Sequence, residues 1–369
     1  MLPFPIPPID KIQEIARSFS QELKDTYEGE KTSLPFLIHT LPRSPHIAEG
    51  SIIQVMVFGG TLFKTSIFQK KSEAFVLIHE EEEEKTPLFI DKKTFVDFTI
   101  QKLNEATDFL VINFAYPIQP ILNDDALDGI LLHGTKEHIF AGMVGSSIGN
   151  IVRNAAQEAA RKSLFVSVAN DAVCLLLSQA TKQNWNEIVG GIIGTGTNYA
   201  ITLPDQTIVN LECGNFHTFP LSESGKQIDV ESSNPGTQRI EKEIAGAYLY
   251  KHYNYYVKRD SPCAPLITSS SHLSEIAANE AHPDCTLARS LLGRSARLAA
   301  AQMAGIYHFK TDLTDLTFVM EGNLFWQGWH YKEQVGQCLG ELGLQSSIHF
   351  TKNEHHSIEG GLRLLKGLS

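Results

Sequence analysis

Short apolar runs alternate with stretches of helical periodicity along most of the chain. Runs rich in β-branched and aromatic residues predict strands at residues 109–114, 164–168, 188–193 and 316–320. Apolar residues spaced three and four apart predict helices at residues 95–104, 148–161, 238–250 and 289–306. Strands that alternate with helices are typical of layered α/β folds, and we expect such a fold here.

The N-terminal segment carries one helical pattern. Ile12, Ile15, Phe19 and Leu23 recur at helical spacing, which predicts an amphipathic helix over residues 12–23. Because its apolar stripe needs a surface to cover, we expect this helix to pack against a larger body. The proline-rich start of the chain is interpreted as an appendage.

Three further segments have their own patterns. Residues 51–68 contain two apolar runs around a Gly-Gly pair, which predicts a strand, a tight turn and a second strand. The glutamate run at residues 80–84 is expected to be a solvated loop or helix edge, since like charges repel one another. Residues 260–283 are rich in serine, proline and polar residues, which predicts a loop with one short helix.

Composition narrows the classes of function. The 369 residues carry a formal net charge of −11, which argues against broad contact with nucleic acid or an anionic membrane. The five cysteines never occur as CxxC, so neither a disulfide framework nor a zinc site is predicted, and a cytoplasmic location is expected. His355 and His356 lack a third ligand at metal spacing and are interpreted as surface residues. We find no basic leader and no apolar span of about 18 residues, and therefore expect a soluble, unsecreted protein.

Glycine-containing turns follow three of the apolar runs. Their glycines let backbone amides approach an anion, so three such turns favour a nucleotide polyphosphate, whereas a single one is readily just a tight turn. Neither the GxGxxG fingerprint nor the Walker pattern is present, which makes dinucleotide-binding and P-loop folds poor fits. The turns comprise Gly59, Gly60 and Thr61; Gly194, Thr195 and Gly196; and Gly322 and Asn323.

Polar residues at predicted strand ends and early helical turns form a second set. Carboxylates and amides suit a polyhydroxylated ligand, because each sugar hydroxyl both donates and accepts a hydrogen bond. Asp171, after one strand and before an apolar helix, is the natural general base, and an N-cap is an equal alternative. Glu241 with Lys242 has the alternative of a solvated helix face. The set contains Thr135, Lys136, Asn170, Asp171, Asn198, Glu212, Gln238 and Glu241.

These residues lie in motifs that resemble the hexokinase family in order and spacing. The motifs are FAYP at 114–117, TK at 135–136, NDAV at 170–173, GTGTN at 194–198, NLECG at 210–214 and NPGTQRIEKEIAG at 234–246. The segments GRSARLAAAQMAGI, EGNLFWQ and SIEGGLRLL also resemble the family's large-lobe helix, adenosine-side loop and closing helix. The resemblance therefore covers nearly the whole chain.

The resemblance implies a two-lobed, actin-like (ribonuclease H-like) α/β ATPase fold with an interlobe cleft. Residues 51–170 are expected to form the small lobe, which residues 355–369 rejoin. Residues 171–354 are expected to form the large lobe, and residues 1–50 to pack on it as the appendage.

The resemblance also implies an activity, the ATP-dependent phosphorylation of a hexose, with glucose as the expected substrate, at its 6-hydroxyl in the first step of glycolysis. Asp171 would take the hydroxyl proton, and the other seven polar residues would hold the sugar ring. The ATP site would use Gly59, Gly60, Thr61, Lys64, Gly194, Thr195, Gly196, Gly246, Gly322 and Asn323. Mg²⁺ would arrive bound to ATP, with no metal site of the protein's own, and the protein would act as a monomer or homodimer.

Several positions depart from the family's pattern. Val57 stands where the family has the aspartate of its first phosphate loop, and Leu62 and Lys64 replace an asparagine and an arginine. Ala115 and Cys213 replace a serine and a tryptophan near the sugar. These changes leave two hypotheses open, an active hexose kinase and a non-catalytic sugar sensor, with a kinase for another acceptor as a third. Retention of Asp171 favours the active kinase, because a sensor needs hydrogen bonds but no base.

Overall fold

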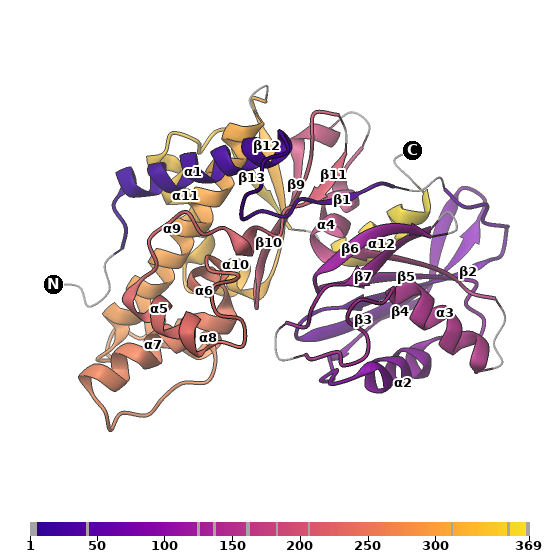
Figure 1. Cartoon of the computed structure of the whole chain (residues 1–369), viewed down its shortest axis with the longest axis horizontal. Coiled ribbons are helices and arrows are strands. Elements are labelled where there is room, and N and C mark those ends of the chain that lie inside the picture. Colours follow the sequence, from indigo (N-terminus) through magenta and orange to yellow (C-terminus); the bar gives the residue numbers. More distant parts are fainter. Residues whose placement is uncertain are drawn as a thin grey trace. The chain divides into compact units, whose positions relative to one another are not determined.

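The computed structural model describes residues 6–41, 44–123, 126–135, 138–159, 163–181, 184–205, 207–310, 313–352 and 355–366. The chain divides into two compact units (Figure 1). Unit 1 comprises Met1–Phe36, Gly191–Tyr199 and Leu211–Lys352, and unit 2 comprises Leu37–Gly190, Ala200–Asn210 and Asn353–Ser369. The lobe limits predicted from the sequence differ from the limits of these two units, and the division into lobes remains a prediction.

Unit 2 contains a five-stranded sheet of order β4-β3-β2-β5-β8. The strands are β2 (Ile52–Phe58), β3 (Leu62–Lys71), β4 (Ala74–Lys85), β5 (Phe109–Phe114) and β8 (Phe165–Asn170). Strand β2 is antiparallel to β3 and parallel to β5, which in turn is parallel to β8. The predicted hairpin over residues 51–68 and the two predicted strands are confirmed. A two-stranded sheet of β6 (Ile118–Asn123) and β7 (Ala126–Leu131) was not predicted.

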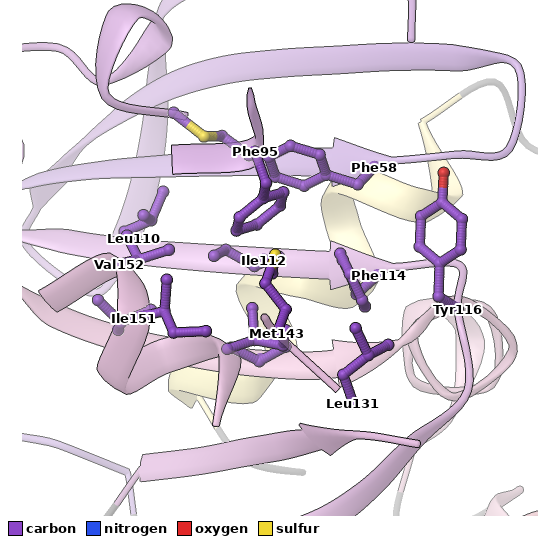
Figure 2. Packing of buried hydrophobic residues seen from close by; sticks show 14 of the residues in the cluster. Phe58, Phe95, Leu110, Ile112, Phe114, Tyr116, Leu131, Met143, Ile151 and Val152 are labelled. Atoms are coloured by element: carbon purple, nitrogen blue, oxygen red, sulfur yellow. The ribbon is translucent and has the colours of Figure 1, made fainter. Parts of the chain in front are cut away.

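The two faces of the five-stranded sheet pack against different helices. Successive strand residues point to opposite faces, so Phe58 and Phe114 share one core with Phe95 of helix α2 (Lys92–Lys102) (Figure 2). Helix α3 (Ile148–Glu158) contributes Ile151 and Val152 to the same core. Helices α2 and α3 confirm the prediction, although residues 160–161 of the second lie outside the described residues.

The opposite face of this sheet is covered by helix α12 (His356–Lys366), which also packs on α4 (Asp171–Gln179). The approach is close. A Cβ added at Gly361 would lie 2.9 Å from Val55 Cγ1, and one at Gly360 would lie 1.8 Å from the Cys174 carbonyl oxygen. Only glycine allows this contact, which explains the Gly-Gly pair in the final helix.

The prediction for the glutamate run is wrong. Residues 80–84 are neither loop nor helix edge but lie within β4 at the edge of the sheet. A lysine on the neighbouring strand and one at the end of α2 offset the like-charge repulsion that motivated the prediction. Lys64 on β3 pairs with Glu81 and Glu83, and Lys102 lies 2.7 Å from Glu84.

The second sheet has the order β1-β11-β10-β9-β12-β13. Its strands are β1 (Leu37–His39), β9 (Ile188–Ile193), β10 (Thr197–Thr202), β11 (Ile208–Asn210), β12 (Leu316–Glu321) and β13 (Ile348–Thr351). Strands β12 and β13 are parallel, whereas β11 is antiparallel to both β1 and β10. The predicted strands at 188–193 and 316–320 are confirmed.

Unit 1 is mainly helical. Helix α1 (Ile9–Tyr27) packs on the buried helix α9 (Cys285–Phe309), where Gly305 makes room for Phe19. The helices predicted at 12–23 and 289–306 are thereby confirmed. The remaining helices are α5 (Glu223–Glu231), α6 (Glu241–Ile244), α7 (Gly246–Asp260), α8 (Ser270–Ala278), α10 (Asn323–Gln327) and α11 (Tyr331–Glu341).

Two predictions in this unit have different outcomes. Helix α8 is the single short helix expected in the polar segment at 260–283. The helix predicted at 238–250 is instead two helices, because Ala245 between α6 and α7 is extended, with ψ of 149°. In the described part of the chain, no helix is both long and apolar enough to cross a membrane.

Candidate active site

Asp171 begins helix α4 directly after strand β8. Asn170, the preceding residue, is the N-cap, and its Oδ1 accepts a hydrogen bond of 3.0 Å from the Ala172 amide. Asp171 Oδ1 also accepts from this amide, at 2.9 Å. The cap position that competed with catalysis for Asp171 thus belongs to Asn170. The partial positive charge at the start of the helix stabilises a carboxylate at the half-buried Asp171.

Tyr116 is hydrogen-bonded to the first glycine turn and lies near the Asp171 charge. Its hydroxyl donates a hydrogen bond of 3.4 Å to the Gly59 carbonyl oxygen. Burial, together with the nearby negative charge of Asp171, raises the pKa of Tyr116 well above its usual value. The phenol therefore stays protonated and remains a donor. Tyr116 belongs to the FAYP motif, but no local pattern in the sequence distinguishes it as a site residue.

The first glycine turn connects β2 and β3. The Gly59 amide donates to the Leu62 carbonyl oxygen at 3.1 Å, and Thr86 Oγ1 donates to the Gly59 carbonyl oxygen at 2.9 Å. A Cβ at Gly59 would lie 2.6 Å from the Leu62 carbonyl oxygen, so the turn requires glycine there. Gly60 and the exposed Thr61 form its tip. The turn has the small, open backbone that a phosphate cradle needs.

Lys64 lies in β3 rather than in the turn. Its Nζ is 3.0 Å from Glu81 Oε1 and 3.0 Å from Glu83 Oε2. Partial burial lowers the pKa of the Lys64 ammonium, but these two carboxylates outweigh that effect and raise it overall. The positive charge expected near the ATP phosphates is therefore held by acidic side chains of β4.

Val57 is buried near the end of β2, paired with Lys64 on one neighbouring strand and with Asn113 on the other. An isopropyl group offers no ligand to a hydrated Mg²⁺ ion. Among the described residues, no three His, Cys, Asp or Glu side chains are grouped closely enough to hold a metal ion. The side chains present at this turn therefore do not fit a protein-held magnesium site.

Thr135 is the one other described sugar candidate of unit 2, since Lys136 lies outside the described residues. Thr135 Oγ1 is buried and has no hydrogen-bond partner in the described structure. A buried hydroxyl without a partner is costly, and a ligand hydroxyl would satisfy it. The turn around it is tight, because a Cβ at Gly134 would lie 2.2 Å from the His138 carbonyl oxygen.

In unit 1, four sugar candidates are brought together by loops around β10. Asn198 Oδ1 accepts hydrogen bonds from the amides of Tyr199 at 2.8 Å and Cys213 at 3.4 Å. Glu241 Oε2 accepts from the Thr197 amide at 3.0 Å. These bonds connect Asn198 to the segment that contains Cys213, and Glu241 to the residue before Asn198.

Glu212 and Gln238 are connected through Asn215. Its Nδ2 donates to the Glu212 carbonyl oxygen at 3.2 Å, and its Oδ1 accepts from the Gln238 amide at 3.3 Å. Both connected residues have left-handed backbone, with φ of 46° and 48°. This conformation is uncommon for residues other than glycine, and such strain is concentrated at functional sites.

Lys242, which follows Glu241 in the sequence, is held in place by two hydrogen bonds. Its side chain is fully buried, and Nζ donates to Asp229 Oδ1 at 2.6 Å and to the Asn234 carbonyl oxygen at 2.9 Å. The alternative that Glu241 and Lys242 form a solvated helix face is therefore wrong for Lys242. Glu241 itself is half-buried.

The nucleotide candidates of unit 1 meet at three glycines. The Gly246 amide donates to the Gly194 carbonyl oxygen at 2.8 Å, and a Cβ at Gly194 would lie 3.2 Å from Gly322 Cα. Gly322 has a φ of 116°, which side chains rarely allow. Gly196 closes the turn by accepting from the Gly194 amide, and the Thr195 carbonyl oxygen accepts from Ala247. Asn323, exposed, begins α10. The three glycines thus let the segments that carry the nucleotide candidates pack closely against one another.

Comparison with known proteins gives a consistent picture. A family model described as Hexokinase matches residues 188–253. Hexokinase-2 of Arabidopsis thaliana is 26% identical over 277 residues, covering 66% of this chain and 54% of that protein. The chloroplastic Hexokinase-2 of Nicotiana tabacum is 32% identical over 147 residues, covering 35% and 29%. The chain spans about half the length of the curated Arabidopsis thaliana relatives that it matches.

Solved structures are similar over nearly the whole chain. A hexokinase from Schistosoma mansoni complexed with glucose has a TM-score of 0.77 at 18% identity, covering 97% of this chain and 95% of that one. A ROK family glucokinase from Streptomyces griseus, in complex with glucose and AMPPNP, has a TM-score of 0.58 at 15% identity, covering 86% and 99%. This likeness confirms the predicted α/β actin-like ATPase fold.

Proposed function

We propose that this chain, which belongs to the hexokinase family, transfers the terminal phosphoryl group of ATP to the 6-hydroxyl of a hexose, with glucose as the first candidate. The observation that carries the proposal is the placement of Asp171. It begins α4, Asn170 takes the cap position, and Tyr116 lies close enough for the Asp171 charge to raise its pKa. A carboxylate held in this way is suited to general-base catalysis.

In the proposed reaction, Asp171 accepts the proton of the sugar hydroxyl while that oxygen forms a bond to the γ-phosphorus of ATP. The bond between this phosphorus and the bridging oxygen breaks, and ADP leaves. The sugar hydroxyls are held by Thr135, whose Oγ1 lacks a partner in the described structure, and by Asn198, Glu212, Gln238 and Glu241. Positioning supplies most of the catalysis in phosphoryl transfer, and a base contributes about 10²- to 10⁴-fold.

Nucleotide contacts are assigned to the backbone around Gly59 and Gly60 and to the three packed glycines of unit 1. A magnesium ion bound to ATP supplies charge neutralisation, and the proposal requires no protein ligand at Val57. We also propose that the reaction serves as the first step of glycolysis in the cytoplasm. The scattered cysteines support that location.

The second candidate function is a sugar sensor without catalysis, and the observation that favours it is Val57 in place of a carboxylate. A hexose would then shift the population of conformations without being phosphorylated. The two candidates share the sugar contacts and differ only in turnover.

Asp171→Asn separates the two candidates when it is compared with the wild type for glucose-dependent ADP release and for glucose affinity. We expect wild-type turnover, a loss of at least about 100-fold in kcat for the variant, and a glucose Kd within about tenfold. Asp260→Asn, an exposed site in unit 1, is the control and should match the wild type. A variant that keeps more than about a tenth of the wild-type rate contradicts the role of Asp171.

A further inference from the structure

Three charged side chains form a compact group on β3 and β4, next to the first glycine turn. The Lys64 ammonium contacts Glu81 and Glu83 at 3.0 Å each. The lysine and Glu81 side chains are about one-fifth exposed, and Glu83 is 46% exposed. With all three ionised, the group carries a net charge of −1, although the resemblance led us to expect a positive charge at this position.

The strand register explains why Lys64 turns toward β4. Its partner across the hairpin is Val57, which offers no charge, and its partner on the other side is Glu83. Glu81 reaches the same ammonium across a register shift between Thr65 and Phe68. A lysine with a carboxylate on one side and an isopropyl group on the other pairs with the carboxylate.

We propose that Glu81 and Glu83 are positioning residues that determine the affinity for ATP by holding Lys64 against competition from the nucleotide's phosphates. This inference rests on the proposed function. It adds that the lysine is engaged before ATP arrives, so ATP must displace or share its ion pairs. It also assigns a role to the glutamate run on β4.

The physical reason lies in the ammonium donors and the local charge. A lysine ammonium has three N–H donors, and the two glutamates occupy two of them. ATP phosphates and carboxylates compete for the same charge-assisted hydrogen bonds, and the group's net charge of −1 also repels a polyanion. Removal of both carboxylate charges should therefore strengthen ATP binding without changing the sugar contacts.

The decisive variant is Glu81→Gln/Glu83→Gln, which keeps side-chain shape while removing both charges. Glu82→Gln is the matched control, because Glu82 is exposed, lies between them in sequence and is paired with Thr65 rather than Lys64. We expect the double variant to lower the Kd of ATP, measured by calorimetry without sugar, by about three- to tenfold, as partly exposed ion pairs allow. The KM of the double variant for ATP should fall by a similar factor, while its kcat and its KM for glucose should stay within about twofold of the wild type. The control variant E82Q should match the wild type in all of these values.

A third variant tests whether the effect acts through the lysine. When Lys64→Gln is added to the double variant, the gain in ATP affinity should disappear, because the interaction is non-additive. An ATP affinity that is unchanged or weaker in the double variant overturns the inference, as does a gain that persists without Lys64. If the wild type still phosphorylates glucose, only the inference has failed. If neither wild type nor double variant binds ATP or turns over, the proposed function itself has failed.

Discussion

Lys242 Nζ lies 2.6 Å from Asp229 Oδ1, although the lysine side chain is fully excluded from solvent. The same ammonium donates to the Asn234 carbonyl oxygen, and Asn234 Nδ2 donates to Gln238 Oε1 at 2.8 Å. A buried charge is therefore connected, through one asparagine, to a residue assigned to the sugar. Removing one partner of such a pair leaves the other charge uncompensated.

Lys242→Met should lower the free energy of unfolding by about 3 kcal/mol, because Asp229 loses its partner in a partly buried setting. Urea denaturation measures this change, and calorimetry should show weaker glucose binding through the disturbed Gln238. Lys258→Met, at an exposed position of α7, should change stability by less than about 0.5 kcal/mol. Equal stability of the two variants would contradict a structural role for the buried ion pair.

Two buried tyrosines of unit 1 should respond oppositely to loss of their hydroxyl groups. Tyr199 Oη has no hydrogen-bond partner in the described structure, whereas the Tyr331 hydroxyl is 2.6 Å from Ser295 Oγ. Tyr199→Phe should leave stability unchanged or raise it by about 1 kcal/mol, since it removes an unpaired buried polar group. Tyr331→Phe should cost about 1 kcal/mol. Denaturation at pH 7 measures the stability of both variants. A larger loss of stability for Tyr199→Phe than for Tyr331→Phe would contradict the conclusion that the Tyr199 hydroxyl is unpaired in the described structure.

Alkaline pH should destabilise the protein in part through Tyr199. Burial raises the pKa of its phenol well above the usual value, so the folded state retains a proton that the unfolded state releases near pH 10. Because the folded state then binds more protons, this contribution to stability is complete below about pH 10 and falls as the pH rises further, by about 1.4 kcal/mol per unit. Tyr199→Phe should show a shallower decline between pH 9 and pH 11. Parallel curves would rule this contribution out.

A carboxylate at position 57 should raise the rate. We expect Val57→Asp to increase kcat/KM for MgATP by about tenfold or more, because charge stabilisation of the transferring group is usually a large catalytic effect. Val57→Asn has the same shape without the charge and should not show the gain. Kinetics across a range of free Mg²⁺ concentrations provide the measurement, and equal behaviour of the two variants would count against this explanation.

The sequence predicted elements whose signal is local. The strands at 109–114 and 188–193 follow from compact β-branched runs, and helix α1 from the spacing of four apolar residues. The glutamates of β4 were misjudged because their neutralisation depends on Lys64 and Lys102, which come from other elements. Hydrophobic periodicity also cannot show the break at Ala245. The amide of the next residue, Gly246, donates to the carbonyl oxygen of Gly194, which lies some fifty residues earlier in the chain.

The residues of the candidate site could be predicted from the sequence, but the contacts that hold them in place could not. Short motifs named Asp171 and Glu241, yet nothing local places Tyr116 against Gly59. Likewise, the left-handed backbone of Glu212 and Gln238 depends on Asn215, which bonds to both segments. Such features arise from contacts between segments that are distant in sequence.

The most direct test of the central claim is the detection of phosphorylated sugar. Purified protein would be incubated with MgATP and, separately, glucose, mannose, fructose or N-acetylglucosamine, and the products identified by mass spectrometry alongside ADP. The account predicts a sugar monophosphate from at least one hexose, formed in proportion to ADP. Binding of glucose by calorimetry without any phosphorylated product from the four sugars would contradict the kinase and establish the sugar sensor in its place.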